Sequence, residues 1–203
     1  MSKTKNNSAQ DSEDVTKEIT QQDSYNSDNN IRCWVAQVKD GEEKIAETLE
    51  EGWTADGVAI IDSKGDTLLI VSLDEVMRQF GGDLSEDIDV DVASPVMSSL
   101  DGESRTAFLR DFYDRTGKEL PAISACVQYG WLPSGGEMAL IYSLKDEINA
   151  VIAALGGQQI SDGKYWTSQR FSNNRTWHCN MSDGRFGIAL GTSSVAGVRA
   201  VKK

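Results

Sequence analysis

The sequence predicts an α+β fold, with helices in the middle of the chain and short strands over its last forty residues. Two observations support this prediction. Residues 131–156 (WLPSGGEMALIYSLKDEINAVIAALG) carry apolar side chains at helical spacing. Four short β-type runs separated by turn residues then follow between 164 and 201. Helices and strands occupy separate stretches, which is typical of α+β proteins rather than of βαβ proteins.

The first thirty residues differ in composition from the rest. They are rich in Ser, Asn, Gln, Asp and Lys, and only five of them are apolar. Such a segment buries too little surface to offset its ordering entropy, so we expect residues 1–30 to be a disordered tail or tether. A short helix around Val15–Ile19 that forms on a partner is the alternative. We expect the ordered domain to span residues 31–203.

Residues 31–80 contain β-rich runs. The alternation of IRCWVAQV (31–38) predicts a strand. In EEKIAETLEEG (42–52), apolar residues at helical spacing predict a short helix that ends at Gly52. GVAIID and TLLIVSL then flank Ser63-Lys64-Gly65-Asp66, which predicts a hairpin. Because both runs are apolar on both faces, we expect these strands to be central in their sheet.

Residues 81–105 are acidic and loop-like. Asp87, Asp89 and Asp91 alternate, so they share one face of an extended chain. Oxygen-rich sites of this kind hold Ca²⁺ in some proteins. A solvated acidic face explains the same pattern more simply, and we favour it.

Three helical segments follow. RTAFLRDFYDRTG (105–117) ends at a glycine, and AISACVQY (122–129) runs into Gly130. In the third, 134–155, Ser134 and Glu137 have the spacing of a capping box and Gly156-Gly157 ends the helix. The residues expected to face the core of these helices are Ala107, Phe108, Leu109, Phe112, Met138, Ile141, Tyr142, Ile148, Val151, Ile152 and Leu155.

The C-terminal runs KYWTSQRF, NRTWHCNM, GRFGIAL and VAGVRAV predict an antiparallel meander. The Asp183-Gly184 pair is a strong hairpin turn. Residues 164–203 contain seven Lys and Arg side chains and one Asp. Exposed arginines on strands and loops suit an anionic ligand, whereas charge complementarity within the fold is an equally good explanation.

Composition limits the classes of function. The 203-residue chain has a net charge of −12, which argues against a general nucleic-acid binder or a polybasic membrane-surface protein. No apolar run is long enough to span a bilayer, so we expect no membrane insertion. The N-terminus has no apolar core typical of a signal peptide, so we expect cytoplasmic synthesis, with release by lysis or inside a particle as alternatives.

Catalytic and metal-binding patterns are missing from the sequence. It has one histidine, His178, and three dispersed cysteines, which are too few for a disulfide framework or a CxxC metal site. His178 and Cys179 are neighbours on a predicted strand and therefore point to opposite faces. We expect His178 to be a partly exposed strand residue, and Cys33 and Cys126 to be buried small hydrophobes. We predict a non-enzymatic binding protein with no cofactor and no metal.

The second half of the chain contains a recognisable order of short motifs. They are Cys126, Gly130-Trp131-Leu132-Pro133-Ser134, Glu137, Ile148-Asn149, Leu155-Gly156-Gly157, Tyr165-Trp166-Thr167-Ser168, Trp177, Ser182-Asp183-Gly184 and Val198-Arg199-Ala200-Val201. This order resembles the Lcl-type C-type-lectin-like domains over about residues 56–203. Ala200 stands where the family favours Pro, and Gln169 where it favours Thr. The calcium and sugar motifs of animal C-type lectins are absent, so Ca²⁺-dependent mannose binding is not implied.

The resemblance implies a fold of two helices and a small antiparallel sheet, with a C-terminal meander of strands and loops. It also implies a ligand-binding role, because variable proteins of diversity-generating retroelements share this fold and vary their C-terminal segment, here about 165–203. Between Arg170 and Gly197 nearly every residue is reachable from an Asn codon by changing adenines. The candidate contact residues are Arg170, Phe171, Ser172, Arg175, Thr176, His178, Arg185, Phe186 and Ile188.

The expected partner is a surface protein or glycan, with an anionic ligand favoured by the arginines. The missing signal peptide fits a phage tail-associated protein of a virion, with residues 1–30 docking on a larger assembly. A fixed-partner adhesin or structural accessory domain without diversification is the main alternative. An enzyme of the formylglycine-generating type is a third, but it needs paired cysteines near the C-terminus, where only Cys179 stands. We expect Trp131, Trp166 and Trp177 to be core residues rather than ligand contacts.

Overall fold

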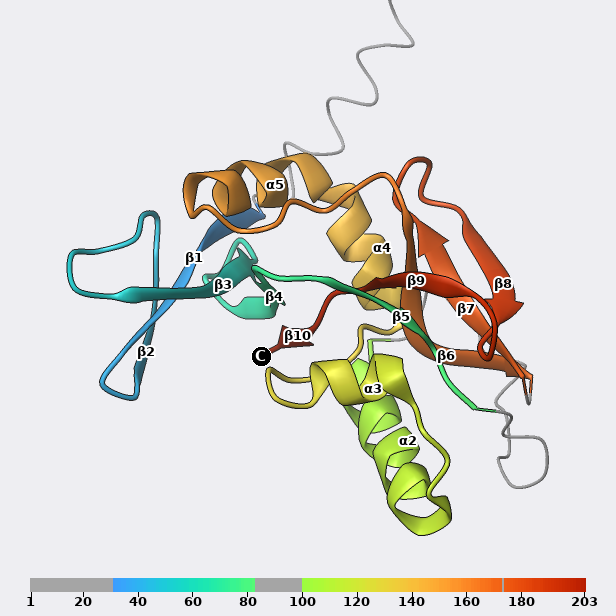
Figure 1. Cartoon of the computed structure of the whole chain (residues 1–203). Coiled ribbons are helices and arrows are strands. Elements are labelled where there is room, and N and C mark those ends of the chain that lie inside the picture. The colour runs from blue at the N-terminus through green and yellow to red at the C-terminus, as the bar shows by residue number, and fades with distance from the viewer. Residues whose placement is uncertain (1–30, 83–99, 173) are drawn as a thin grey trace, which may run out of the picture.

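The structure is a computed structural model, and it describes residues 31–82, 100–172 and 174–203. It is an α+β protein in which four helices and ten strands are described. The predicted disordered tail and the aspartates at 87, 89 and 91 lie outside the described residues. Figure 1 shows α5 above β1 and β3, α4 descending from it toward β9, and α2 and α3 at the bottom of the view. The resemblance implied two helices and one small sheet, whereas the described residues form four helices and two sheets.

The first sheet contains five strands in the order β10-β4-β3-β1-β2. Their bounds are β1 Arg32–Lys39, β2 Glu42–Ala46, β3 Thr54–Ile61, β4 Thr67–Ser72 and β10 Val201–Lys202. The β3–β4 hairpin predicted from the two apolar runs is present. Both of its strands are internal to the sheet, as their two-sided apolar character predicted.

The helix predicted over 42–52 is wrong, because this segment forms β2 and pairs antiparallel with β1. The cause lies in the connection between the two strands. Asp40 has φ 51° and Gly41 has φ 86°, and two consecutive positive φ values characterise the tight turns that join hairpin strands. Pairing with β1 therefore overrides the weak helical spacing of Ile45, Ala46 and Leu49.

The second sheet has the strand order β5-β9-β6-β7-β8. Its strands are β5 Val76–Gln79, β6 Lys164–Ser172, β7 Arg175–Asn180, β8 Phe186–Leu190 and β9 Val195–Val198. Strands β6, β7 and β8 form the predicted antiparallel meander. The meander does not continue into β9, which pairs in parallel with β6 at Tyr165–Gly197 and antiparallel with β5.

Helices α2 (Gly102–Thr116) and α3 (Pro121–Cys126) confirm the two predicted helices before Gly130. Gly117 ends α2 in the left-handed conformation, with φ 69°. The buried face of α2 is rotated from the predicted one. Leu109 and Phe112 are buried as expected, but Phe108 is 49% exposed.

The third predicted helix is interrupted and forms α4 (Gly135–Ser143) and α5 (Lys145–Ala154). Leu144 leaves the helical region, with φ −115° and ψ 16°, and separates the two. The predicted capping box is present, because Glu137 N–H donates to the Ser134 hydroxyl and Ser134 N–H donates to the Glu137 carboxylate.

Two main clusters of buried side chains hold the helices against the sheets. Helices α4 and α5 pack on strands of both sheets through Met138, Ile141, Ile148 and Ile152. Helices α2 and α3 pack on the second sheet around Trp166. The C-terminal strands β6–β8 therefore have one end fixed between helices, while their outer end projects away from them (Figure 1).

Candidate ligand-binding face of the C-terminal sheet

The register of β7 and β8 divides the predicted contact residues between two faces. Residues directly opposite each other in an antiparallel pair point to the same side. Arg175 lies opposite Leu190, and Trp177 opposite Ile188, so these four side chains share one face. Phe171 of β6 joins this face, because its ring makes an edge contact with the Trp177 ring at 5.5 Å between centroids.

This face carries an exposed apolar patch, which we call the outer patch and define as Phe171, Arg175, Trp177, Ile188 and Leu190. Ile188 is 36% exposed and Leu190 41% exposed. Phe171 and Trp177 are half-buried, and Arg175 is exposed. Two aromatic rings, two aliphatic side chains and a guanidinium group therefore lie together at the outer end of the sheet, and the Trp and Arg side chains among them are of the types enriched at binding hot spots.

The opposite face is buried and holds three of the predicted contact residues. Thr176 is 1% exposed, His178 6% and Arg170 8%. The expectation of a partly exposed His178 is therefore wrong. Its ring packs edge-on against Trp166, at 6.1 Å between centroids. Burial lowers the pKa of His178, and Lys164 lowers it further, so this side chain is a neutral packing group at pH 7.

The remaining predicted contacts lie at the margins of the meander. Arg185 is exposed in the β7–β8 turn, and its guanidinium lies 3.8 Å from the Asp183 carboxylate. Ser172 is half-buried at the end of β6. Phe186 is half-buried and packs against the core beside α4. Of the nine predicted residues, Phe171, Arg175, Arg185 and Ile188 are thus placed best to meet a ligand.

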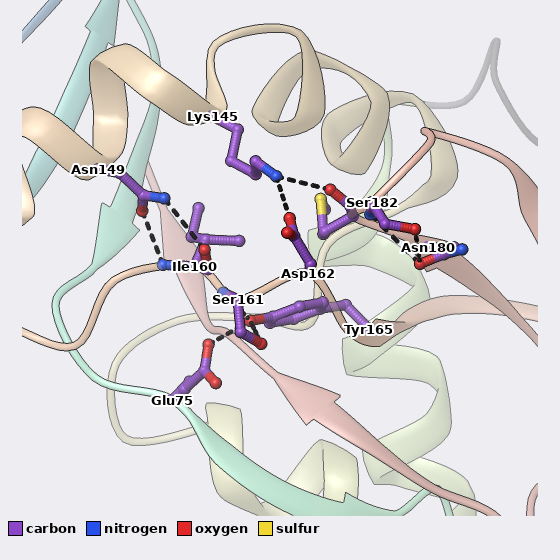
Figure 2. A network of polar contacts seen from close by, with 10 residues as sticks. Glu75, Lys145, Asn149, Ile160, Ser161, Asp162, Tyr165, Asn180 and Ser182 are labelled. Atoms are coloured by element: carbon purple, nitrogen blue, oxygen red, sulfur yellow. Dashed lines mark hydrogen bonds and ion pairs between the residues drawn. The ribbon is translucent and has the colours of Figure 1, made fainter.

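Polar contacts tie the base of the meander to α5 (Figure 2). Lys145 donates to the Met181 carbonyl at 2.8 Å and to the Asp162 carboxylate at 2.6 Å. The Asn180 carboxamide oxygen accepts bonds from the backbone N–H and the hydroxyl of Ser182. These contacts fix the β7–β8 turn, so the outer patch is displayed from a rigid base.

The loop that leads into β6 is held by two further contacts that Figure 2 shows. The Asn149 side chain donates to the Ile160 carbonyl at 3.0 Å and accepts from the Ile160 N–H at 2.7 Å. Tyr165 donates to the Glu75 carboxylate at 2.5 Å and accepts from the Ser161 N–H at 2.9 Å. Burial, followed by the bond to Glu75, raises the pKa of Tyr165, so its hydroxyl remains a donor at neutral pH.

Cys126 and Cys179 are buried, whereas Cys33, expected to be buried, is only half-buried. Cys179 is fully buried, and burial raises its pKa to about 11. Burial likewise raises the pKa of Cys126 to about 12 and that of Cys33 to about 11. All three are protonated at neutral pH and are poor nucleophiles. Within the described residues, no group of three or more His, Cys, Asp or Glu side chains is placed to hold a metal ion.

Two shallow grooves lie away from the outer patch. One, of about 400 Å³, runs between α2 and Trp131 and is lined by Glu103, Arg110 and Asp114. The other, of about 390 Å³, lies between the two sheets and includes Asp56 and Asp74. Both carry several charged side chains and neither is enclosed.

Two residues of the outer patch, Trp177 and Leu190, are not among the contact residues predicted from the sequence. Trp177 was expected in the core, and Leu190 was not among the predicted contacts. The available pattern was the alternation of Ile188 and Leu190 with the buried-face residues Gly187 and Ala189. The register with β7, which places Trp177 opposite Ile188, is visible only in the structure.

No family model and no curated protein sequence matches this chain. Among solved structures, it is similar to a fimbrial protein from Bacteroides ovatus ATCC 8483, with a TM-score of 0.57 at 15% sequence identity. The match covers 84% of this chain and 48% of that chain, so this chain spans about half of its length. At this identity the likeness concerns the fold alone. In the described residues, no helix is both long and apolar enough to cross a bilayer.

Proposed function

We propose that this chain is a non-catalytic recognition protein whose outer patch binds a surface protein or glycan. The observation that carries the proposal is the patch itself. Ile188 and Leu190 are exposed beside Trp177, on a meander whose base is anchored by Lys145 and Asn180. Exposed apolar patches with aromatic and Arg side chains on rigid elements mark interaction sites.

We further propose that the scaffold is C-type-lectin-like and that its C-terminal segment is of the diversified kind. The motif residues of the resemblance support this division of labour. Tyr165, Trp166, Ser168, Val198 and Arg199 are all at most 3% exposed. They lie in or beside the sheet, whereas some of the residues between them, among them Arg175 and Ile188, reach the surface. Diversification would then act on Phe171, Arg175, Arg185, Ile188 and similar exposed positions, as antibody loops vary on a constant frame.

A second candidate is a fixed-partner adhesin or structural accessory domain of the same fold. Two observations favour it. The similar solved structure is described as a fimbrial protein. Moreover Arg170, Thr176 and His178, which belong to the adenine-reachable segment, are buried, so free variation there would damage packing. In this reading the outer patch contacts one constant protein.

Recognition is tested by probing a glycan array and a panel of bacterial surface proteins with the labelled full chain. We expect binding that falls at least about tenfold in Trp177→Ala, the loss typical of a hot-spot aromatic. Met77→Ala is the matched control, because Met77 is 55% exposed on β5 at the opposite edge of the same sheet. Equal loss in both variants, or binding unchanged in Trp177→Ala, contradicts the proposal.

Diversification is tested separately by sequencing the DNA that flanks the gene. We expect a near-copy of codons 165–203, differing only where the copy holds adenine, beside a reverse-transcriptase reading frame. Absence of both favours the fixed-partner candidate. A pull-down with the full chain, including residues 1–30, then identifies the partner and tests docking on a larger assembly.

A further inference from the structure

Strand β8 forms an open edge of the second sheet. The strand order is β5-β9-β6-β7-β8, and within residues 31–82, 100–172 and 174–203 only β7 pairs with β8. The register between them is continuous over five residue pairs, from Arg175–Leu190 to Cys179–Phe186. Every second residue of such an edge directs its N–H and C=O groups away from the sheet, which is a template for another strand. The Leu190 carbonyl already accepts a bond from the Ser194 N–H at 2.9 Å, so the open groups are those of Phe186 and Ile188 and the Leu190 N–H.

This edge lacks the features that normally block strand pairing. Proteins protect edges with charged side chains, prolines or bulges. The β8 sequence FGIAL contains no charge and no proline, and its pairing with β7 has no register shift. The outer strand of the first sheet is a contrast within the same molecule: β2, EEKIA, carries Glu42, Glu43 and Lys44.

From this edge we infer the binding mode: an extended peptide segment adds to β8 as a sixth strand, with its apolar side chains on the outer patch. The inference rests on the proposed recognition function and specifies its partner. Ile188 and Leu190 alternate on the exposed face, so a paired strand would set every second side chain beside them. Backbone pairing provides affinity in this mode, and the alternate side chains provide specificity.

Charge defines the ends of the expected segment. Arg175 is exposed beside Leu190 at one end of β8, and Arg185 is exposed just before the other end. Asp183 is the one acidic residue in 164–203, against seven Lys and Arg. The partner segment is therefore apolar at alternate positions and carries Asp or Glu at its ends.

The same charges disfavour a second copy of this chain as the occupant. Antiparallel pairing of two β8 strands about Ile188 would set Phe186 of each copy opposite Leu190 of the other. Arg185 of one copy would then approach Arg175 of the other, because Arg175 lies beside Leu190. Like charges this close oppose each other at an edge. A partner of opposite charge is the better fit.

The test uses the full chain and a panel of fluorescent peptides of about nine residues, a usual strand length. Each peptide has Asp at both ends and alternates Thr with Val, Ile, Leu or Phe. Matched peptides carry N-methyl groups on alternate amides, which removes backbone donors and keeps the side chains. We expect binding by fluorescence anisotropy to at least one peptide, and loss of binding when the amides that face β8 are methylated.

Variants of the chain locate the site. We expect Ile188→Lys to weaken peptide binding at least about tenfold, because a charge blocks the edge. Met77→Lys, at the opposite edge of the same sheet, is expected to bind as the unmodified chain does. Added salt is expected to weaken binding, since Arg175 and Arg185 are exposed.

Four results would overturn the inference. The first is that no peptide binds at up to about 1 mM, the weakest affinity of interest, and the second is that methylated peptides bind as well as unmethylated ones. The third is that Ile188→Lys has no effect on peptide binding, and the fourth is that the chain alone dimerises through β8 in sedimentation velocity. The failures of the two proposals are distinguishable. If methylated peptides bind but Trp177→Ala weakens that binding, the outer patch still recognises ligands and only strand addition is wrong. If Trp177→Ala has no effect on any ligand, the recognition proposal itself fails.

Discussion

Replacing Glu75 with alanine is expected to destabilise the protein strongly. Glu75 lies just before β5 and connects the two sheets through Arg199, which follows β9. The Arg199 guanidinium donates to the Glu75 carboxylate at 2.7 Å, and the two side chains are 1% and 6% exposed. Tyr165 donates to the same carboxylate oxygen at 2.5 Å. Glu75 is thus the acceptor for a buried cation and a buried hydroxyl.

The size of the effect follows from what the substitution leaves behind. Arg199 keeps its bonds to the Ser72 carbonyl at 2.9 Å and the Gln158 carbonyl at 2.6 Å. Its charge, however, loses the carboxylate with which it pairs, in a position almost closed to water. Breaking a buried ion pair by removing one partner costs about 3–5 kcal/mol. We expect a loss in this range in the free energy of unfolding.

The assay is urea unfolding followed by tryptophan fluorescence. Asp111→Ala is the matched control, because its ion pair with Arg115 is 65% and 62% exposed, and exposed pairs contribute less than about 1 kcal/mol. Glu75→Gln keeps an acceptor for Tyr165 but removes the charge, so we expect an intermediate loss. If the free energy of unfolding of Glu75→Ala lies within about 1 kcal/mol of that of the unmodified chain, the buried pair does not hold the two sheets together.

Three further predictions concern single side chains. Ser134→Ala removes the helix cap of α4 and is expected to cost about 1 kcal/mol in urea unfolding; an unchanged midpoint would exclude the capping role. Gly184 has φ 70°, and a Cβ there would lie too close to the Tyr142 ring. Gly184→Ala is therefore expected to lower the free energy of unfolding by more than about 1–2 kcal/mol. An unchanged free energy of unfolding would mean that the turn differs from the one described. The pKa of His178 is lower in the fold than its ordinary 6.5, so the unfolded chain binds the proton more readily. The stability that comes from neutral His178 is present above about pH 6.5 and is lost as the pH falls. The free energy of unfolding of His178→Asn is therefore expected to change less between about pH 7 and 5.5 than that of the unmodified chain.

Local chemistry made several elements predictable from the sequence. The β3–β4 hairpin combines two apolar runs with a turn-forming Lys64-Gly65-Asp66 segment, so propensity, pattern and turn agree. The Ser134–Glu137 capping box is specified by residues three positions apart and is formed as predicted. Contacts of this kind are short in sequence, and the sequence displays them directly.

Longer-range pairing decided the elements that were not predicted. The segment 42–52 has helical spacing, but the Asp40-Gly41 turn returns it to β1. Strand β9 lies between β5 and β6 because of pairing over more than a hundred residues, from Val76 to Val198. No local pattern encodes such a neighbour.

The sequence predicts a candidate site on the C-terminal strands but does not predict which of its residues are exposed. The arginines and aromatic residues of the last forty positions indicated a recognition surface, and four of nine predicted contacts are well placed on it. Period-two alternation alone does not say which face of a strand is covered. His178 packs against Trp166 and Thr176 is buried on the same face, whereas Leu190 is exposed and Trp177 half-buried on the opposite face.

The location of ligand binding tests the central claim most directly. Hydrogen–deuterium exchange of the full chain, with and without a ligand retained on the array or a bound peptide, reports which amides become protected. We predict that added protection is confined to residues 170–190 and is greatest in β8. Protection centred on α2 and Trp131, or on the groove beside Asp56 and Asp74, with β7 and β8 unchanged, would contradict the assignment of recognition to the outer patch.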